Sequence, residues 1–217
     1  MEHYYSLNQY LRQTFGQKIY KISLNGGMTC PNRDGSLDTR GCIFCSAGGS
    51  GDFAAAPAPI AVQIEAAKSQ VSAKTKGGPY IAYFQAYTNT CGELQKLKAL
   101  YEEALAVDDV VGLVIGTRPD CMPDELLEYL EELSKKVFVL VEYGVETSKN
   151  ATLEIINRGH TWEDAVDAVN RTKAHNILCG IHLIIGLPGE TIDDILATAD
   201  AVSTLPLDTV KLHQLQL

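Results

Sequence analysis

Residues 110–145 read VVGLVIGTRPDCMPDELLEYLEELSKKVFVLVEYGV. The stretch opens with an apolar run at 110–115 and closes with another at 137–145, and both are apolar nearly throughout, as strands covered on two faces should be. Between them, residues 123–135 follow a helical pattern, with Pro123 well placed in a helix's first turn. Strand, helix and strand in this order predict a βα unit leading into the next strand of a parallel sheet.

The same alternation continues on both sides of this stretch. Further strands are predicted at residues 20–24, 81–85, 180–185 and 210–215, and further helices at 60–74, 93–105, 162–175 and 191–205, after an opening helix from about 3 to 15. Six βα units can form a partly closed barrel or an open doubly wound sheet, and periodicity alone does not decide between them. In both, chemistry collects in the loops that follow the strands.

The bulk composition is that of an ordinary globular domain. The chain has 217 residues, of which 46% are apolar and 21% charged, and we expect a single domain. Since there is no basic and apolar leader and no run of about 18 apolar residues, we expect a cytoplasmic protein without a membrane segment. The net charge of −9 argues against an overall electrostatic footprint for nucleic acid, but a local basic patch is compatible with it.

The two ends of the chain carry separate expectations. Residues 1–18 are expected to form an N-terminal helical extension. The chain stops at Leu217, in or just after the sixth predicted strand and without a closing helix. We therefore expect a C-terminal region, or a partner protein, to complete the domain.

Three cysteines gather in one glycine-rich loop after the first predicted strand. Residues 25–45, NGGMTCPNRDGSLDTRGCIFC, carry Cys30, Cys42 and Cys45 in the spacing C-x11-C-x2-C. Soft thiolates suit an iron–sulfur cluster, and three protein ligands leave one iron of a [4Fe-4S] cluster open to another group. In a chain without a secretory leader, such thiols are expected to be reduced or to bind metal rather than to pair as disulfides.

Other readings of these cysteines remain open at this point. A structural zinc site normally has four protein ligands, and no fourth Cys or His follows at a suitable spacing. A redox pair of Cys42 and Cys45 leaves Cys30 unexplained, and three ordinary buried cysteines do not suit a polar loop. The remaining cysteines sit singly and are expected to be small buried side chains: Cys91, Cys121 and Cys179.

Together with five further motifs, this loop resembles the radical S-adenosylmethionine (SAM) superfamily, and within it the branch of the Elongator catalytic subunit and the YhcC-like bacterial proteins. Phe44 precedes the last cysteine as in that family, and a long first interval is a feature of the branch. The other motifs are YFQAYTNT at 83–90, TRPD at 117–120, EYGVETS at 142–148 with NRGH at 157–160, HLIIGLPGET at 182–191, and KLH at 211–213. The resemblance implies a partial (β/α)6 barrel, a parallel sheet with outer helices, over residues 1–217.

The same resemblance implies roles for individual residues. The backbone from Gln85 to Thr88 would contact the methionine amino group, and Arg158 would pair with the methionine carboxylate. Glu146 and His182 would contact the ribose. Phe44 and Leu187 would lie beside the adenine. Read from the residues alone, Glu142 and Glu146 are also compatible with buried ion pairs to Arg158 or Lys211.

The implied activity is reductive cleavage of SAM to a 5′-deoxyadenosyl radical by a reduced [4Fe-4S] cluster, with an electron donor of flavodoxin or ferredoxin type. The branch also implies RNA as the substrate, with a wobble uridine of tRNA as the candidate. The alternative is a non-catalytic iron–sulfur or zinc protein that senses redox state or scaffolds a complex. Such a protein would not need Arg158 or a cofactor cavity.

Overall fold

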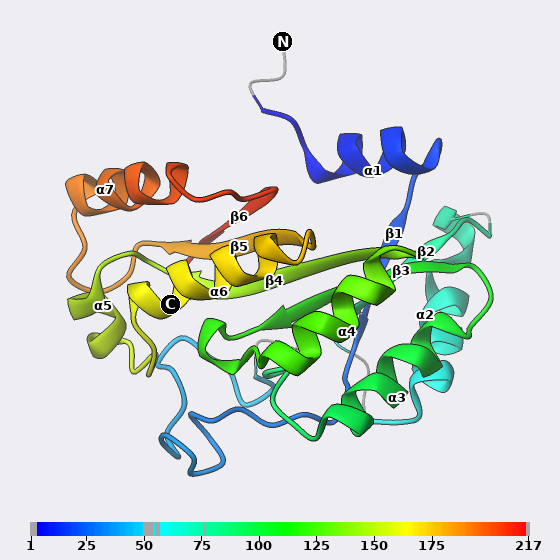
Figure 1. The fold of residues 1–217 in the computed structure, drawn as a ribbon, viewed down its shortest axis with the longest axis horizontal. Helices are drawn as coiled ribbons and strands as arrows, with labels where there is room; N and C mark the ends of the chain where they lie inside the picture. Colours follow the sequence, from blue (N-terminus) through cyan, green and yellow to red (C-terminus); the bar gives the residue numbers. More distant parts are fainter. Residues whose placement is uncertain (1–3, 50–53, 55–56, 76, 216–217) are drawn as a thin grey trace.

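A computed structural model describes residues 4–49, 54, 57–75 and 77–215 of the protein (Figure 1). Six parallel strands make one sheet: β1 (Tyr20–Leu24), β2 (Tyr80–Phe84), β3 (Val110–Thr117), β4 (Phe138–Glu146), β5 (Leu178–Ile185) and β6 (Thr209–Gln214). The helices are α1 (Leu7–Phe15), α2 (Ile60–Thr75), α3 (Leu94–Leu105), η1 (Pro119–Cys121), α4 (Asp124–Ser134), α5 (Asn150–Ile155), α6 (Trp162–Ala174) and α7 (Ile192–Ser203).

The predicted strands and long helices are all present, with ends that differ by a few residues. The opening helix begins at Leu7 rather than near residue 3, which lies outside the described residues, because Ser6 caps it and Gln9 completes a capping box. The short elements α5 and η1 were not predicted. No helix in the described part of the chain is both long and apolar enough to cross a membrane.

The strands follow one another in the sheet in chain order, β1 to β6. A doubly wound sheet reverses its strand order at a switch point, and this sheet does not. Five gaps between flat neighbouring strands would separate β1 from β6 by about 24 Å. Nevertheless Lys21 of β1 and Lys211 of β6 both lie over the ring of Tyr83, at 4.5 and 5.8 Å from its centroid. The sheet is therefore strongly curved, as in a partial barrel.

The two faces of the sheet bury different layers. Alternate strand residues such as Phe84, Ile115 and Val141 pack outward into the main core with the helices that cover that face. On the inner face, Ile81, Val114 and Leu140 pack in a second cluster with the apolar side of α1. Helix α1 thus closes the end of the half-barrel where the strands begin, and Figure 1 shows it apart from the outer helices. The opposite end, where the strands finish, stays open.

Candidate functional site

A cavity of about 460 Å³ occupies the open end of the half-barrel. It is lined by all the predicted site residues but one: Cys30, Cys42, Phe44, Cys45, Gln85, Thr88, Glu146, Arg158 and His182. The exception, Leu187, is 2% exposed and packs with Phe44 and Ile184 in a small cluster behind the cavity wall. Leu187 therefore supports the wall at Phe44 instead of facing the cavity.

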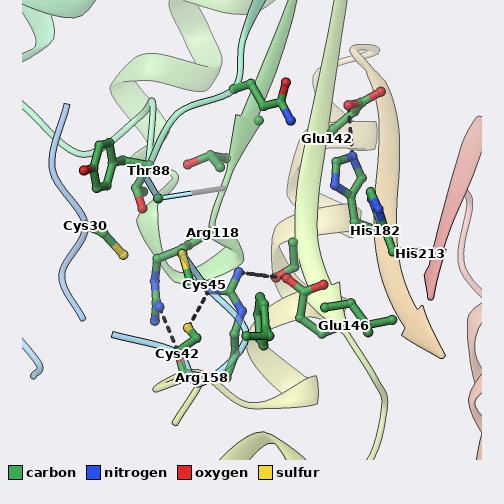
Figure 2. A pocket seen from close by; sticks show the side chains of 18 of the residues that line it. Cys30, Cys42, Cys45, Thr88, Arg118, Glu142, Glu146, Arg158, His182 and His213 are labelled. Atoms are coloured by element: carbon green, nitrogen blue, oxygen red, sulfur yellow. Dashed lines mark hydrogen bonds and ion pairs between the residues drawn. The ribbon is translucent and has the colours of Figure 1, made fainter. Parts of the chain in front are cut away.

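The cysteine loop is held by side chains rather than by regular structure. Buried Asn32 donates to the carbonyls of Asn157 (2.6 Å) and Arg158 (3.0 Å), so it ties the loop to the turn after α5. Arg33 Nη2 donates to the carbonyls of Cys45 (2.9 Å) and Ser46 (2.6 Å). Figure 2 shows the three cysteine side chains together on one side of the pocket. These contacts hold the cysteines in place at the cavity.

The segment that follows β2 forms hydrogen bonds to the cysteine loop through Tyr87 and Thr88. Tyr87 has a left-handed backbone (φ 62°), its N–H donates to the Gly49 carbonyl at 2.8 Å and its hydroxyl donates to the Ala47 carbonyl at 2.8 Å. A Cβ on Gly49 would stand 2.3 Å from the Tyr87 ring, so only glycine permits this approach. The Thr88 N–H donates to the Thr29 carbonyl at 3.1 Å. The predicted cofactor segment is thus anchored to the cysteine loop at both ends of that loop.

The three cysteines of this loop are not arranged as ligands of a single metal ion. Within residues 4–49, 54, 57–75 and 77–215, no three His, Cys, Asp or Glu side chains are grouped as ligands of one metal ion. A mononuclear zinc site brings its sulfurs within roughly 3.8 Å of one another, since each Zn–S bond is about 2.3 Å. In a four-iron cluster each thiolate binds a different iron, and the sulfurs surround an inorganic core instead of meeting at one atom.

The surroundings of Arg158 show whether a cofactor with a carboxylate could bind in the cavity. Its Nη2 donates to the Gly144 carbonyl at 2.6 Å and lies 3.4 Å from Glu146 Oε1, and its Nη1 lies 3.6 Å from Cys42 Sγ. Its Nε is buried and has no partner among the described residues. A buried guanidinium with an unused donor, next to a cysteine sulfur, suits an anionic group brought to the metal side of the cavity.

Gly144 makes room for this arrangement. A Cβ at that position would stand 2.6 Å from Arg158 Nη2 and 2.7 Å from Glu146 Oε1. Glu146 is 7% exposed, and burial raises its pKa against the opposing charge of Arg158. The predicted pairing of Glu146 with Arg158 is therefore present, and the same two side chains line the cavity.

The TRPD motif contributes Thr117 and Arg118 to the cavity lining, and Arg118 also holds the backbone of Arg158. Arg118 is 2% exposed, and its Nε and Nη2 pair with both carboxylate oxygens of Asp120 at 2.9 and 2.8 Å. Its Nη1 donates to the Arg158 carbonyl at 2.7 Å. A Cβ on Gly159 would meet Asn32 Oδ1 at 2.6 Å, so this turn packs closely on the cysteine loop. Arg118 and Asn32 thus position the backbone of Arg158 from two sides.

The inner face of the sheet contributes a polar layer on the far side of the pocket from the cysteines, where Figure 2 shows Glu142, His182 and His213. We call this layer the cavity floor. It consists of the cavity-lining residues Tyr83, Glu142, His182, Lys211 and His213, together with Lys21, which contacts Glu142 and Tyr83. Glu142 Oε1 lies 3.5 Å from Lys21 Nζ, and its Oε2 lies 3.0 Å from His182 Nε2. The ion pair of Glu142 is thus with Lys21, and among the described contacts it is with neither Arg158 nor Lys211, the two partners that the sequence suggested.

Titration of Glu142 should be visible in the acid stability of the protein. Burial would raise the pKa of Glu142, but the His182 hydrogen bond and the charges of Lys21 and Lys211 lower it from 4.5 to about 2. A folded-state pKa below the unfolded value stabilises the protein above pH 4.5, and that stabilisation is lost as the pH falls toward 2. The free energy of unfolding of wild type should exceed that of Glu142→Gln, and the difference should shrink by up to about 1.4 kcal/mol per pH unit below pH 4.5.

Urea unfolding of both proteins between pH 7 and pH 3 measures this difference. Glu154→Gln, at an exposed position on α5, is the control and should follow the wild-type curve. If the free energies of unfolding of wild type and Glu142→Gln differ by the same amount at every pH, Glu142 is not held ionised by its neighbours.

Several residues of the site were missed from the sequence. Asn32 and Arg33 sit in a loop without periodicity, and nothing in their spacing marks them. Lys21 had a signal, because its alternation with buried Ile22 and Leu24 places it on the inner face of β1. Cys91 and Cys121, expected to be single buried residues, are half-buried and their thiols contact each other, whereas Cys179 is buried as expected.

Comparison with known proteins identifies the family. The model of the radical SAM superfamily matches residues 39–202, and the chain belongs to this superfamily. It is 45% identical over 215 residues to YtqA of Bacillus subtilis (strain 168), covering 99% of this chain and 67% of that protein. It is 38% identical over 208 residues to YhcC of Escherichia coli (strain K12), covering 95% and 66%. The chain thus spans about two thirds of the length of these relatives, and the YhcC-like resemblance is confirmed.

Two solved structures share the fold. Elp3 of the archaeon Methanocaldococcus infernus has a TM-score of 0.64 at 18% identity, over 90% of this chain and 45% of that one. HemN of Escherichia coli, a coproporphyrinogen III oxidase described as a radical SAM enzyme, has a TM-score of 0.61 at 14% identity, over 98% and 48%. The predicted partial (β/α)6 barrel of radical SAM type is confirmed. A shorter match, 33% over 97 residues, is to a tRNA uridine(34) acetyltransferase of Methanocaldococcus jannaschii, over 42% of this chain and 17% of that protein.

Proposed function

We propose that this protein binds a [4Fe-4S] cluster through Cys30, Cys42 and Cys45 and catalyses the reductive cleavage of SAM. The observation that carries the proposal is one cavity that combines the three cysteines with Arg158, whose buried Nε has no partner among the described side chains. A redox sensor or scaffold would need the cysteines alone. The joint presence of a metal-binding loop and a carboxylate-binding arginine favours an enzyme.

The cluster, when bound, supplies the electron that breaks a carbon–sulfur bond of SAM. The protein's own part is to bind and orient. Arg158 would hold the methionine carboxylate beside the cluster, and Glu146 and His182 would accept or donate hydrogen bonds to the ribose. Phe44, backed by Leu187, would pack on the adenine. Helix α1 packs on the inner face of the sheet at the other end of the half-barrel.

Two donors approach Cys42, the buried member of the three loop cysteines. Asn32 Nδ2 lies 3.4 Å and Arg158 Nη1 3.6 Å from Cys42 Sγ. Hydrogen bonds to a ligating sulfur orient it and offset its negative charge, as partners behind a metal ligand generally do. Arg158 would therefore serve two groups, the sulfur of Cys42 and the carboxylate of SAM.

The experiment that tests the proposal is anaerobic reconstitution with iron and sulfide, reduction with dithionite, and incubation with SAM in the absence of substrate. We expect 5′-deoxyadenosine and methionine to form together. A fully reconstituted protein that forms neither product would support the alternative, a non-catalytic iron–sulfur protein that senses redox state or scaffolds a complex.

For the substrate of the whole protein we propose RNA, with a tRNA wobble uridine as the first candidate. The support is the partial similarity to a protein named tRNA uridine(34) acetyltransferase. We further propose that residues 1–217 act as one domain, reduced by a flavodoxin or ferredoxin, with a further region or partner protein closing the cavity. Comparing the 217-residue chain with a full-length relative such as YtqA on candidate tRNAs tests this, and equal turnover by both would contradict the need for closure.

A further inference from the structure

We propose that the cavity floor binds a substrate group that carries a single negative charge, either a carboxylate or a phosphodiester. This inference rests on the proposed function, because floor and cysteines share one cavity. It assigns to Lys211 and His213 of β6 a role in recognising the substrate and not the cofactor.

The floor contains more positive than negative charge. Lys21 and Lys211 contribute two ammonium groups, and Glu142 contributes one carboxylate. Burial and the neighbouring charge of Lys211 lower the pKa of His213 to about 4, so its ring is neutral at pH 7. Burial and Glu142 raise the pKa of Tyr83, which keeps its hydroxyl protonated. Leaving His182 out of the count, two ammonium groups face one carboxylate, so one positive charge is left without a counter-charge.

That surplus charge lies on Lys211. Both carboxylate oxygens of Glu142 are engaged, one by Lys21 and the other by His182. In the part of the chain that the structure describes, Lys211 has no carboxylate within 4 Å, and its ammonium lies 5.8 Å from the Tyr83 ring centroid. Burial lowers the pKa of Lys211 while Glu142 opposes the shift. A half-buried ammonium without an ion-pair partner is costly unless an anion joins it.

Within the cavity floor, His182 is the proposed ribose contact, whereas Lys211 and His213 have no proposed role with the cofactor. Lys211 and His213 line the cavity, and Figure 2 shows His213 with Glu142 on the opposite side of the pocket from the cysteines and Arg158. An anion held by Lys211 would therefore face the cofactor across the cavity. His213, two residues along β6 and on the same face, can donate one hydrogen bond to it.

The chemistry of the floor also limits the charge of the ligand. One unpaired ammonium balances one negative charge, which matches a carboxylate or a phosphodiester rather than a phosphate monoester. The floor contains no arginine, so it has no guanidinium to donate two parallel hydrogen bonds to a planar anion. A carboxylate would come from a small organic acid, and a phosphodiester from a nucleic acid.

The test is calorimetric titration of the reconstituted protein, with SAM present, using acetate as the carboxylate probe and dimethyl phosphate as the phosphodiester probe. We expect at least one probe to bind wild type, Lys211→Met to weaken it at least tenfold, and Lys211→Arg to restore most of the affinity. Lys18→Met is the matched control, because Lys18 also lies over a tyrosine ring, Tyr20 at 4.4 Å, but is exposed outside the cavity.

The outcomes separate this inference from the proposed function. Binding of acetate alone would identify an organic acid as the substrate class, and binding of dimethyl phosphate alone a nucleic acid. If wild type cleaves SAM but binds neither probe, or if Lys211→Met and wild type bind a probe equally, the anion site is wrong and the proposed function stands. If a fully reconstituted wild type does not cleave SAM, the proposed function fails whatever the probes do.

Discussion

Replacing Cys30, Cys42 or Cys45 with alanine removes the bound iron from the anaerobically purified protein. Each cysteine supplies one of the three thiolates proposed to hold the cluster, and all three line the cavity. Wild type should carry about four iron atoms per chain, as one [4Fe-4S] cluster requires, and each single variant should carry a small fraction of that. Iron and sulfide analysis together with the visible absorption spectrum measures the loss.

The chain offers matched controls for this experiment. Cys91→Ala, Cys121→Ala and Cys179→Ala remove thiols of similar size outside the three-cysteine set, and they should keep the iron. Cys91 and Cys121 are the stringent controls, because their thiols contact each other near Cys30. Retention of iron in a loop-cysteine variant, with its loss in one of these controls, would show that the ligands are assigned wrongly.

Replacing Arg158 with alanine should leave the cluster in place and weaken the binding of SAM. Charge-assisted hydrogen bonds contribute about 1.5–3 kcal/mol, which corresponds to roughly a tenfold to more than a hundredfold loss of affinity. Calorimetric titration of the reconstituted protein with SAM measures the change. Arg158→Lys should recover part of the affinity, since an ammonium supplies the charge but not the paired donors.

Arg158→Ala also leaves the buried carboxylate of Glu146 without its partner, so a control must show that the variant still folds. Arg158→Ala removes the ion pair to Glu146, whereas Arg158→Met combined with Glu146→Gln removes both charges together. Arg171→Ala, which breaks ion pairs on the surface of α6, is the control outside the cavity and should keep wild-type affinity. Unchanged affinity for SAM in folded, cluster-bearing Arg158→Ala would exclude the proposed carboxylate contact.

Much of the fold could be predicted from the sequence because its strands are buried on both faces. Runs such as those of β3 and β4 are nearly all apolar, and α4 between them has an apolar face formed by Leu126, Leu127 and Leu130. The element α5 was missed because its six residues span fewer than two helical turns, too few for a periodic signal. Hydrophobic periodicity does not reveal the order of the strands in the sheet. Either that order or the family motifs were therefore needed to choose a partial barrel over a doubly wound sheet.

The candidate site divides in the same way. The order of the motifs along the chain predicted that the cysteines, Glu146, Arg158 and His182 share one cavity, and they do. The reason is that loops at the ends of parallel strands meet at one edge of the sheet. The motif did not distinguish a residue that faces the cavity from one that supports its wall, as Leu187 does. The pairing of Lys21 with Glu142 was not predicted, since only the curvature of the sheet brings β1 across to β4.

The most direct test of the central claim is electron paramagnetic resonance of the reduced, reconstituted protein before and after SAM is added. The account predicts the signal of a reduced [4Fe-4S] cluster whose shape changes when SAM is added, because one iron is left open for the amino and carboxylate groups of methionine. The same change should appear in Lys18→Met and be much weaker at equal SAM concentration in Arg158→Ala. A full cluster signal that stays the same at saturating SAM would contradict the account.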